Sequence, residues 1–122
     1  MSFETDIIAE IEDIVGHSRV YPLMAADDAT FPYITYSFDA EDWSGHLEAD
    51  ADEVASSLEI KIHALSIKDA YAVADPLKKN LQQFNSDDVL SLTLDTSGDD
   101  YRYHNERYIA EHNQSWFIGH RI

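Results

Sequence analysis

Histidine and carboxylate side chains are the groups in this 122-residue sequence that could bind a metal ion or transfer protons. His104, His112 and His120 stand eight residues apart, so they would share one face of an unbroken strand. Strand residues at that spacing are separated by roughly 26 Å, which is too far for one metal ion to bind two of them. We therefore expect these three histidines to be surface or interface side chains.

His63 lies in an alternating stretch and would share the polar face of a strand with Glu59 and Lys61. Opposite charges and polar groups on one sheet face commonly form cross-strand pairs. We therefore interpret His63 as a member of such a pair and assign it no catalytic role.

Two acidic clusters carry some of the oxygen ligands that a calcium site needs. Neither has ligands at alternate positions followed by a glycine and a distant glutamate, as an EF-hand loop requires. Weak, nonspecific divalent binding is the most that they predict, and we expect no metal site and no cofactor. The clusters are Asp95, Asp99 and Asp100 around Gly98, and Glu48, Asp50 and Asp52.

The common catalytic motifs are missing from the sequence. None of the four glycines, at positions 16, 45, 98 and 119, opens a phosphate-binding loop, and neither a Gly-x-Ser-x-Gly elbow nor an HExxH pair occurs. The chain has no cysteine, which excludes disulfides, zinc–thiolate sites and cysteine nucleophiles. We expect a protein that is not an enzyme, with no catalytic residues.

Composition predicts one folded domain, residues 1–122, because 44% of the residues are hydrophobic. Eight Lys and Arg against 24 Asp and Glu give a net charge of −16, which repels nucleic acid. Salt adaptation or solubility alone is one explanation of this charge. No apolar run is long enough to span a bilayer, and the acidic N-terminus differs from a signal peptide, so we expect a soluble intracellular protein.

The stretch 57–84 predicts a half-buried strand that leads into a helix. Apolar residues alternate up to Ala64, and then recur at helical spacing over about 66–83, with Ser66 as N-cap. Pro76 should kink this helix or start a second segment near Asp75. The inward residues are Leu58, Ile60, Ile62 and Ala64 of the strand, and Ala70, Ala74, Leu77 and Leu81 of the helix.

The other segments predict a helix over about 3–16, ended by Gly16, and short strands at 19–22 and 33–38. Leu90, Leu92 and Leu94 should share one face of a strand, followed by a turn at 96–100. Residues 107–122 should form one strand, or two with a break near 113–115, and 101–104 could pair or loop. The class is α+β: a mainly antiparallel or mixed sheet with the two helices packed on one face.

Residues 39–55 read as a long acidic loop or protruding hairpin. Trp43 in its middle must either fold back on the domain or contact a partner. The acidic residues of this segment that we single out are Asp39, Glu41, Asp42, Glu48, Asp50 and Asp52.

This order of elements resembles the tail completion, or tail terminator, proteins of long-tailed phages, of siphovirus or myovirus type, over nearly the whole chain. The features that carry the resemblance are Val20-Tyr21-Pro22, Pro32-Tyr33-Ile34-Thr35-Tyr36, the strand ending in Ala64-Leu65-Ser66, and the helix with Ala70, Ala74, Leu77 and Leu81. The chain departs from the family in its acidity, its longer acidic segment and Pro76.

The resemblance implies a six-membered ring that caps the tail tube and joins it to the head. The implied partners are further copies of the chain, the tail tube protein and a head completion or stopper protein of the neck, without a membrane. The chain would be made in the host cytoplasm and located in the virion, at the tail or neck. DNA would pass through the ring without specific binding, and an acidic wall suits that passage because it repels phosphates.

A closed ring needs one surface of each subunit to fit a different surface of the next. Exposed aromatic side chains are suited to such contacts, and acidic residues of the 39–55 segment are suited to the lumen. The aromatic residues that we expect there are Trp43, Tyr101, Tyr103 and Trp116.

Two other functions fit parts of the sequence. An acidic DNA mimic that inhibits a nucleic-acid-binding protein would explain the charge of −16, and would bind in a strongly salt-dependent way. A metal-assisted hydrolase built from clustered Asp and His is the third hypothesis, which chelator treatment would test.

Overall fold

The structure of the protein, a computed structural model, describes residues 3–25, 29–39, 53–104 and 106–121. It has two helices and a five-stranded mixed sheet, so the predicted α+β class is confirmed. The elements are helix α1 (Phe3–Val15), strands β1 (Val20–Pro22), β2 (Tyr33–Asp39) and β3 (Glu53–Ala64), helix α2 (Ile67–Leu81), and strands β4 (Val89–His104) and β5 (Arg107–Arg121).

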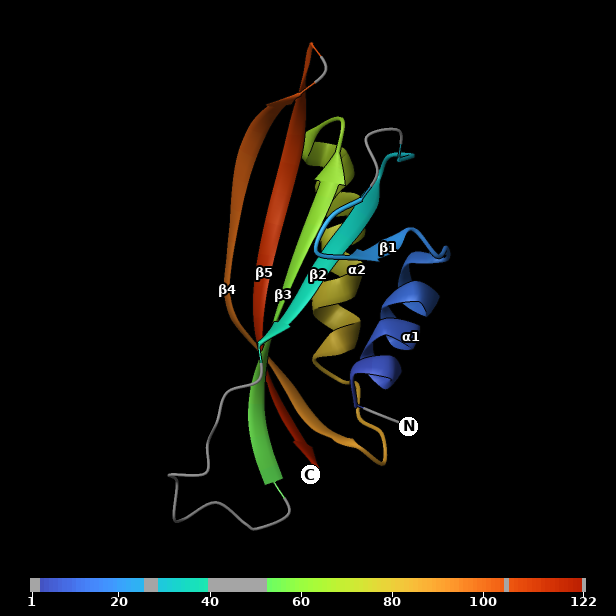
Figure 1. Ribbon diagram of the computed structural model, residues 1–122, viewed down its shortest axis with the longest axis vertical. Coiled ribbons are helices and arrows are strands. Elements are labelled where there is room, and N and C mark those ends of the chain that lie inside the picture. The colour runs from blue at the N-terminus through green and yellow to red at the C-terminus, as the bar shows by residue number, and fades with distance from the viewer. Residues whose placement is uncertain (1–2, 26–28, 40–52, 105, 122) are drawn as a thin grey trace.

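The strand order in the sheet is β1-β2-β3-β5-β4 (Figure 1). β1 pairs with β2 in parallel, and the other neighbours are antiparallel. The short strand with Pro22 lies at the edge of the sheet, where the missing N–H of proline costs no ladder hydrogen bond. β3 and β5 have a neighbouring strand on each side, and their side chains alternate between the two faces of the sheet.

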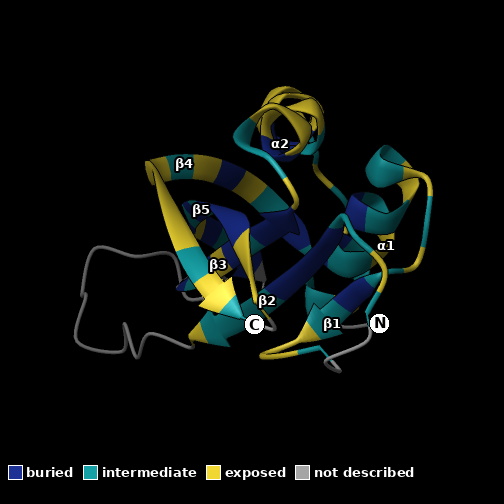
Figure 2. Ribbon diagram, turned by 90° about the horizontal axis from the view of Figure 1, so that it is seen from above, coloured by how far each residue is buried: buried dark blue, intermediate teal, exposed yellow. Residues whose placement is uncertain are grey.

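Both helices lie on the same face of the sheet, as predicted (Figure 2). We call this the helix face and the opposite one the open face. Ile7 and Ile11 of α1 are fully buried against the helix face. The alternating residues of β3 and the inward residues of α2 join them in one core, because each presents an apolar stripe at its own period. They are Leu58, Ile60, Ile62, Ala64, Ala70, Ala74, Leu77 and Leu81.

Helix α2 begins at the predicted cap, where the Asp69 N–H donates to Ser66 Oγ at 3.1 Å. The helix continues through Pro76, so the second segment expected near Asp75 does not form. Proline removes the donor to the carbonyl of Ala72, and this residue is exposed, so that solvent can satisfy the carbonyl. Gly16 ends α1 in a left-handed conformation, with φ of 77°.

The turn predicted at residues 96–100 is wrong, because β4 continues as one strand through this segment. Two register shifts against β5, between Val89 and Ser91 and between Leu94 and Thr96, each absorb one extra residue. The first shift takes Leu90 out of the buried face that Leu92 keeps. Pairing with β5 therefore overrides the local turn preference of the residue types at 96–100.

β5 has no break near 113–115, because those residues pair with β3 on one side and β4 on the other. β3 begins at Glu53, four residues before the predicted start, and Asp39 closes β2. The acidic segment is therefore shorter than the predicted 39–55 and covers residues 40–52, which lie outside the described residues.

The β4–β5 hairpin extends beyond the rest of the sheet (Figure 1). The last pair of β3 joins Ala64 to Ala110, so residues 102–104 and 107–109 pair only with each other, and Tyr101 pairs with Ala110 at the base of this part. We call this part the hairpin tip. No helix in the described part of the chain is long and apolar enough to cross a membrane.

Candidate functional site

Tyr101 and Tyr103 lie at the hairpin tip and are 58% and 62% exposed, as an assembly contact requires. Tyr108 stands opposite Tyr103 in the register and is 67% exposed, with its ring 5.0 Å from that of Tyr103. Sequence reasoning missed Tyr108 because the hairpin register that joins the two tyrosines is a tertiary property. The tip therefore carries three exposed aromatic side chains, and their role in assembly stays a prediction.

Trp116 was expected to be exposed, and this expectation is wrong. Its side chain is 0% exposed and lies on the helix face, opposite Leu58. Its Nε1 donates to Gln114 Oε1 at 3.1 Å, so the indole N–H keeps a partner inside the core. The alternation of Trp116 with Phe117 was visible in the sequence, but which of the two faces the helices cover was not. The structure removes Trp116 from the candidate contacts.

The predicted acidic lumen or loop residues, and the predicted contact Trp43, are only partly within the described residues. Asp39 is exposed at the end of β2, and its backbone carbonyl accepts a hydrogen bond from Ser57 Oγ at 3.5 Å. The remaining predictions lie outside the described residues: Glu41, Asp42, Trp43, Glu48, Asp50 and Asp52.

The cluster of Asp95, Asp99 and Asp100 does not converge on one point. Consecutive strand residues point to opposite faces, which separates Asp99 from Asp100. Asp99 accepts hydrogen bonds from His112 Nδ1 at 2.7 Å and from the Tyr71 hydroxyl, and these bonds hold the pKa of its carboxyl below the usual range. The described residues contain no group of three or more side chains that could hold a metal ion.

The expectation that the C-terminal histidines are surface side chains is wrong for two of them. His112 and His120 are 6% and 7% exposed, because the even-numbered positions of central strand β5 face the helices. His120 Nε2 lies 2.8 Å from Ser56 Oγ, and the ring stacks on Phe3 with centroids 3.6 Å apart. His104 stands on β4, so the three do not share one strand.

A polar chain crosses the core from His112 to helix α2. Gln114 Nε2 donates to the backbone carbonyl of Ala74 at 3.3 Å and lies 3.4 Å from His112 Nε2. With the bond from Trp116, these contacts satisfy the buried amide. We assign these hydrogen-bonded side chains a structural role, since they connect α2 to the centre of the sheet.

The open face holds a polar cluster built from four strands. His63 on β3 lies between Thr35 on β2 and Glu111 on β5. Thr35 Oγ1 is 2.9 Å from His63 Nε2, and His63 Nδ1 is 3.1 Å from Glu111 Oε2. Arg102 on β4 donates from Nε to the same Glu111 oxygen at 2.9 Å and from Nη2 to the Tyr33 hydroxyl at 3.2 Å. The predicted cross-strand role of His63 fits this geometry.

Burial lowers the pKa of His63 to about 4, against the opposing pull of Glu111, and the cations Arg102 and Lys61 lower it further. The imidazole is therefore neutral at pH 7. We assign the proton to Nδ1, where it is donated to Glu111, so that Nε2 accepts from the Thr35 hydroxyl. The ring also stacks on Tyr33 with centroids 4.5 Å apart.

Hydroxyl, imidazole and carboxylate follow each other in the order used by nucleophilic hydrolases. Here, however, Thr35 is only 6% exposed, and Arg102 binds the carboxylate oxygen that His63 also contacts. The arrangement therefore fixes the guanidinium of Arg102 at the surface instead of presenting a reactive hydroxyl.

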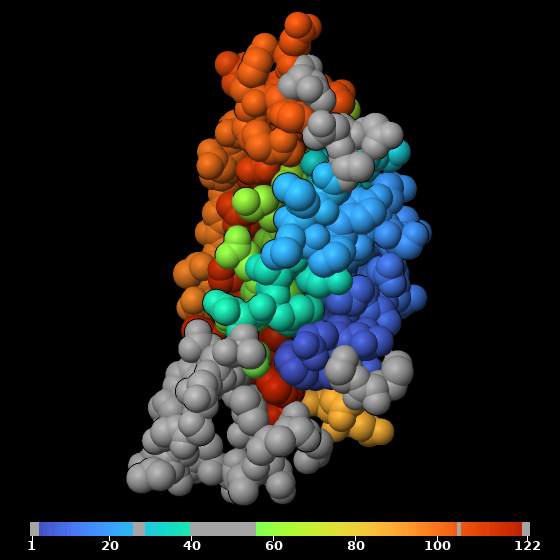
Figure 3. Space-filling view, viewed as in Figure 1, coloured from blue at the N-terminus to red at the C-terminus, as the bar shows by residue number. Residues whose placement is uncertain are grey.

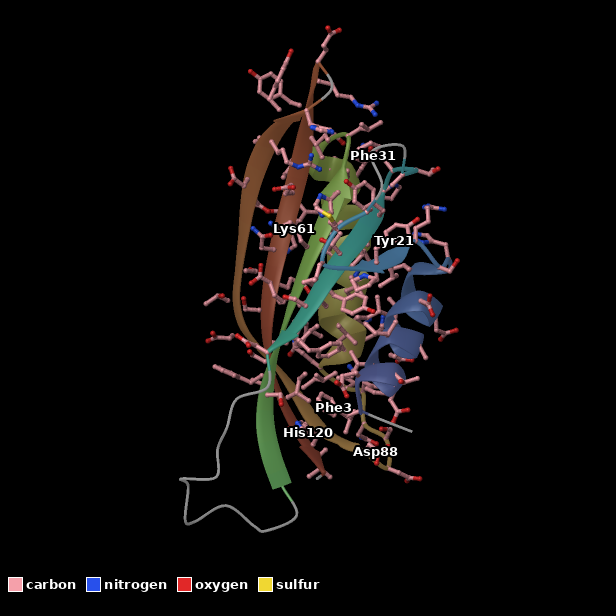
Figure 4. All side chains as sticks on the ribbon, in the orientation of Figure 1. Phe3, Tyr21, Phe31, Lys61, Asp88 and His120 are labelled. Carbon is pink, nitrogen blue, oxygen red and sulfur yellow. The ribbon has the colours of Figure 1, made fainter. Side chains whose placement is uncertain are left out.

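This cluster forms the floor of a pocket of about 370 Å³ at the open face. Lys61 and Arg107 also line it, and the Arg107 guanidinium lies 5.0 Å from the centroid of the Phe31 ring. We call the surface formed by Leu23, Met24, Phe31, Lys61, Arg102 and Arg107 the basic pocket; Figure 4 labels Phe31 and Lys61. Sequence reasoning missed this pocket, because Lys61 is distant in sequence from Arg102 and Arg107 and only the strand order brings it beside them.

A second hollow, of about 670 Å³, lies between α1 and the segment that follows α2. Figure 3 shows these two parts, blue and yellow-orange, side by side at the lower edge of the molecule. Ser86 Oγ donates to Asp6 Oδ2 at 2.8 Å across it. We call this hollow the acidic groove; its lining includes Asp6, Glu10, Phe84, Asp87 and Asp88.

No protein-family model matches the sequence, and a comparison with curated proteins finds no match. Among solved structures, the chain is similar to a chain of a structure described as "Virion of native gene transfer agent (GTA) particle". The TM-score is 0.63 at 14% sequence identity, and the match covers 93% of this chain and 86% of the other. This likeness shows that the two chains share a fold over nearly their whole lengths.

Proposed function

We propose that the protein is a structural component of a phage virion. The observation that carries this proposal is the fold shared with a chain of a virion particle, since the match spans 93% of this chain and omits little of the other. The resemblance of the sequence to phage tail terminators supports the same class independently of that match.

More specifically, we propose that the protein caps the end of the tail tube and joins it to the head–neck complex as a ring of six copies. It would bind the tail tube protein on one side and a head completion or stopper protein on the other. The two hollows support a ring, because they are different surfaces of opposite charge and a head-to-tail contact needs two different surfaces. The net charge of −16 supports passage of DNA without adhesion.

The proposed role is structural, without enzymatic activity. The one described hydroxyl–imidazole–carboxylate arrangement keeps Thr35 buried and uses its carboxylate to hold Arg102. Buried polar groups that bind one another in this way stabilise a unique arrangement of strands. This role agrees with a sheet that must hold the hairpin tip and both hollows in fixed positions.

Native mass spectrometry of the protein alone and mixed with tail tube protein tests the proposal, together with electron microscopy of the tubes. We expect a species of six times the 13.9-kDa chain mass, located at tube ends. A chain that stays monomeric in the mixture and leaves tube ends bare would contradict the terminator role. Salt-sensitive binding of that monomer to a basic nuclease or repressor would favour the DNA mimic instead.

A further inference from the structure

We propose that the basic pocket is a docking surface for the acidic groove of a second copy of this chain. The contact is head-to-tail, because each copy offers its pocket to one neighbour and its groove to the other. This contact depends on the proposed function only in one respect, namely that successive copies close into a ring of six.

The charge of the pocket stands out against the rest of the molecule. Three of the eight Lys and Arg residues of the chain line it, and among the lining residues that the structure describes Glu111 is the one carboxylate. Within the part of the chain that the structure describes, Lys61 and Arg107 form no ion pair. His63 adds no charge at pH 7, because burial lowers its pKa to about 4. A concentration of positive charge in a chain of net charge −16 fits an acidic partner, and every further copy of the chain is one.

Two of the three cations of the pocket, Arg102 and Arg107, are held in position before any partner arrives. Arg102 is fixed by Glu111 and by the Tyr33 hydroxyl, and Arg107 lies over the ring of Phe31. Phe31 in turn contacts Tyr33, with ring centroids 5.1 Å apart. Side chains that are already ordered lose little conformational entropy on binding, and a guanidinium matches the geometry of a carboxylate.

The rim of the pocket adds two exposed apolar side chains. Leu23 and Met24 are 77% and 78% exposed, although they are among the large hydrophobic residues of the chain. Leu23 has a φ of 67°, a conformation that is uncommon for a residue with a branched side chain. Hydrogen bonds from Leu23 N to Tyr36 O at 2.8 Å and from Met24 N to Pro22 O at 2.7 Å hold this turn. Arginine, methionine and aromatic residues are the types enriched in protein interfaces.

The acidic groove is complementary to the pocket in charge. Its lining combines four carboxylates with the half-buried ring of Phe84. The carboxylates can pair with the cations of the basic pocket, and the Phe84 ring can contact its apolar rim. Asp88 lies at the opposite end of the molecule from Phe31, as Figure 4 shows. The two surfaces can therefore be used at the same time by two different neighbours, which a ring requires. DNA is a poorer occupant of the pocket, because the net charge of −16 repels it.

Charge-reversal variants of the full chain test the contact. Lys61→Glu with Arg107→Glu changes the pocket, and Glu10→Lys with Asp88→Lys changes the groove. Lys68→Glu with Lys78→Glu, on exposed positions of α2, is the control with the same charge change as the pocket variant. Self-association is measured by native mass spectrometry and sedimentation, with tail tube protein present and absent, after circular dichroism has shown that each variant is folded.

We expect the pocket variant and the groove variant each to weaken self-association by at least about tenfold, and the control to leave it unchanged. An equal mixture of the two variants should associate again, because each reversed surface then meets its complement in alternating copies. Association of the pocket variant like the wild type, a mixture that stays dissociated, or a wild type that never self-associates would overturn the contact. Loss of association in the variants without any binding of the wild type to tube ends would support the contact and contradict the tail-terminator role.

Discussion

His63 and Glu111 are direct partners on the central strands β3 and β5, with His63 Nδ1 3.1 Å from Glu111 Oε2. The pair forms the floor of the basic pocket and holds Arg102 at its wall. A buried neutral imidazole and a carboxylate therefore position the cation on which the proposed contact depends.

The first prediction concerns pH. The folded pKa of His63 is about 4, below the value of 6.5 for an unperturbed histidine, so the folded state binds fewer protons between these values. The contribution of the neutral His63 side chain to the free energy of unfolding is complete above pH 6.5 and is lost as the pH falls from 6.5 to 4. The loss is on the order of 3 kcal/mol at most. We expect His63→Gln to flatten this part of the profile, measured as the free energy of unfolding in urea from pH 8 to pH 4. Parallel profiles for the variant and the wild type would contradict the lowered pKa.

The second prediction concerns the Glu111 carboxylate. Glu111→Gln leaves the guanidinium of Arg102, whose side chain is 35% exposed, without its ion pair, and offers Arg102 and His63 only a neutral amide oxygen as acceptor. We expect a loss of about 1–3 kcal/mol in the free energy of unfolding. Glu59→Gln is the matched control on an exposed position of the same sheet face, and should change the stability by less than about 0.5 kcal/mol. Equal effects of the two variants would argue against a structural role for the cluster.

A third prediction separates the core from the surface at adjacent positions. Trp116→Ala empties a fully buried site and should cost about 3–5 kcal/mol, measured by urea denaturation. Phe117→Ala removes a ring that is 49% exposed on the open face, and should cost less than about 1 kcal/mol. The opposite order of effects would mean that β5 pairs with its neighbours in a register shifted by one residue.

The fourth prediction concerns the hairpin tip. Tyr101→Ser with Tyr103→Ser removes exposed aromatic area without disturbing the core, so the melting temperature should change by only a few degrees. If Tyr101 and Tyr103 are assembly contacts, as the sequence predicts, the variant should bind tail tube ends at least about tenfold more weakly than the wild type. Leu65→Ser, at an exposed position between β3 and α2, is the control. Wild-type binding by the tyrosine variant would exclude the tip from the assembly contacts.

Local patterns were sufficient for most of the elements. Helix α2 followed from Ser66 and the spacing of its inward residues, and the end of α1 followed from Gly16, because caps and amphipathic stripes are determined within a few residues of chain. The prediction of a turn at 96–100 was wrong because it, too, relied on a local pattern alone. Its residue types favour a bend, but the pairing of β4 along β5 supplies hydrogen bonds that no local pattern reveals.

The basic pocket could not be predicted in this way. Lys61, Arg102 and Arg107 belong to three strands, and their meeting depends on the strand order β1-β2-β3-β5-β4 and on the register between the strands. Tyr108 was missed and Trp116 was misplaced for a related reason. Alternation shows that neighbours point to opposite faces, but does not show which face the helices cover.

The sequence by itself determined the α+β class, the two helices, the apolar face of β3 and the strongly acidic charge, because these depend on composition and on short-range periodicity. Only the tertiary structure decided that His112, Trp116 and His120 are buried, that Tyr101 and Tyr103 share a tip with Tyr108, and that Lys61, Arg102 and Arg107 line one pocket. Strand order and register are set by contacts between residues distant in the chain, and no local pattern records those contacts.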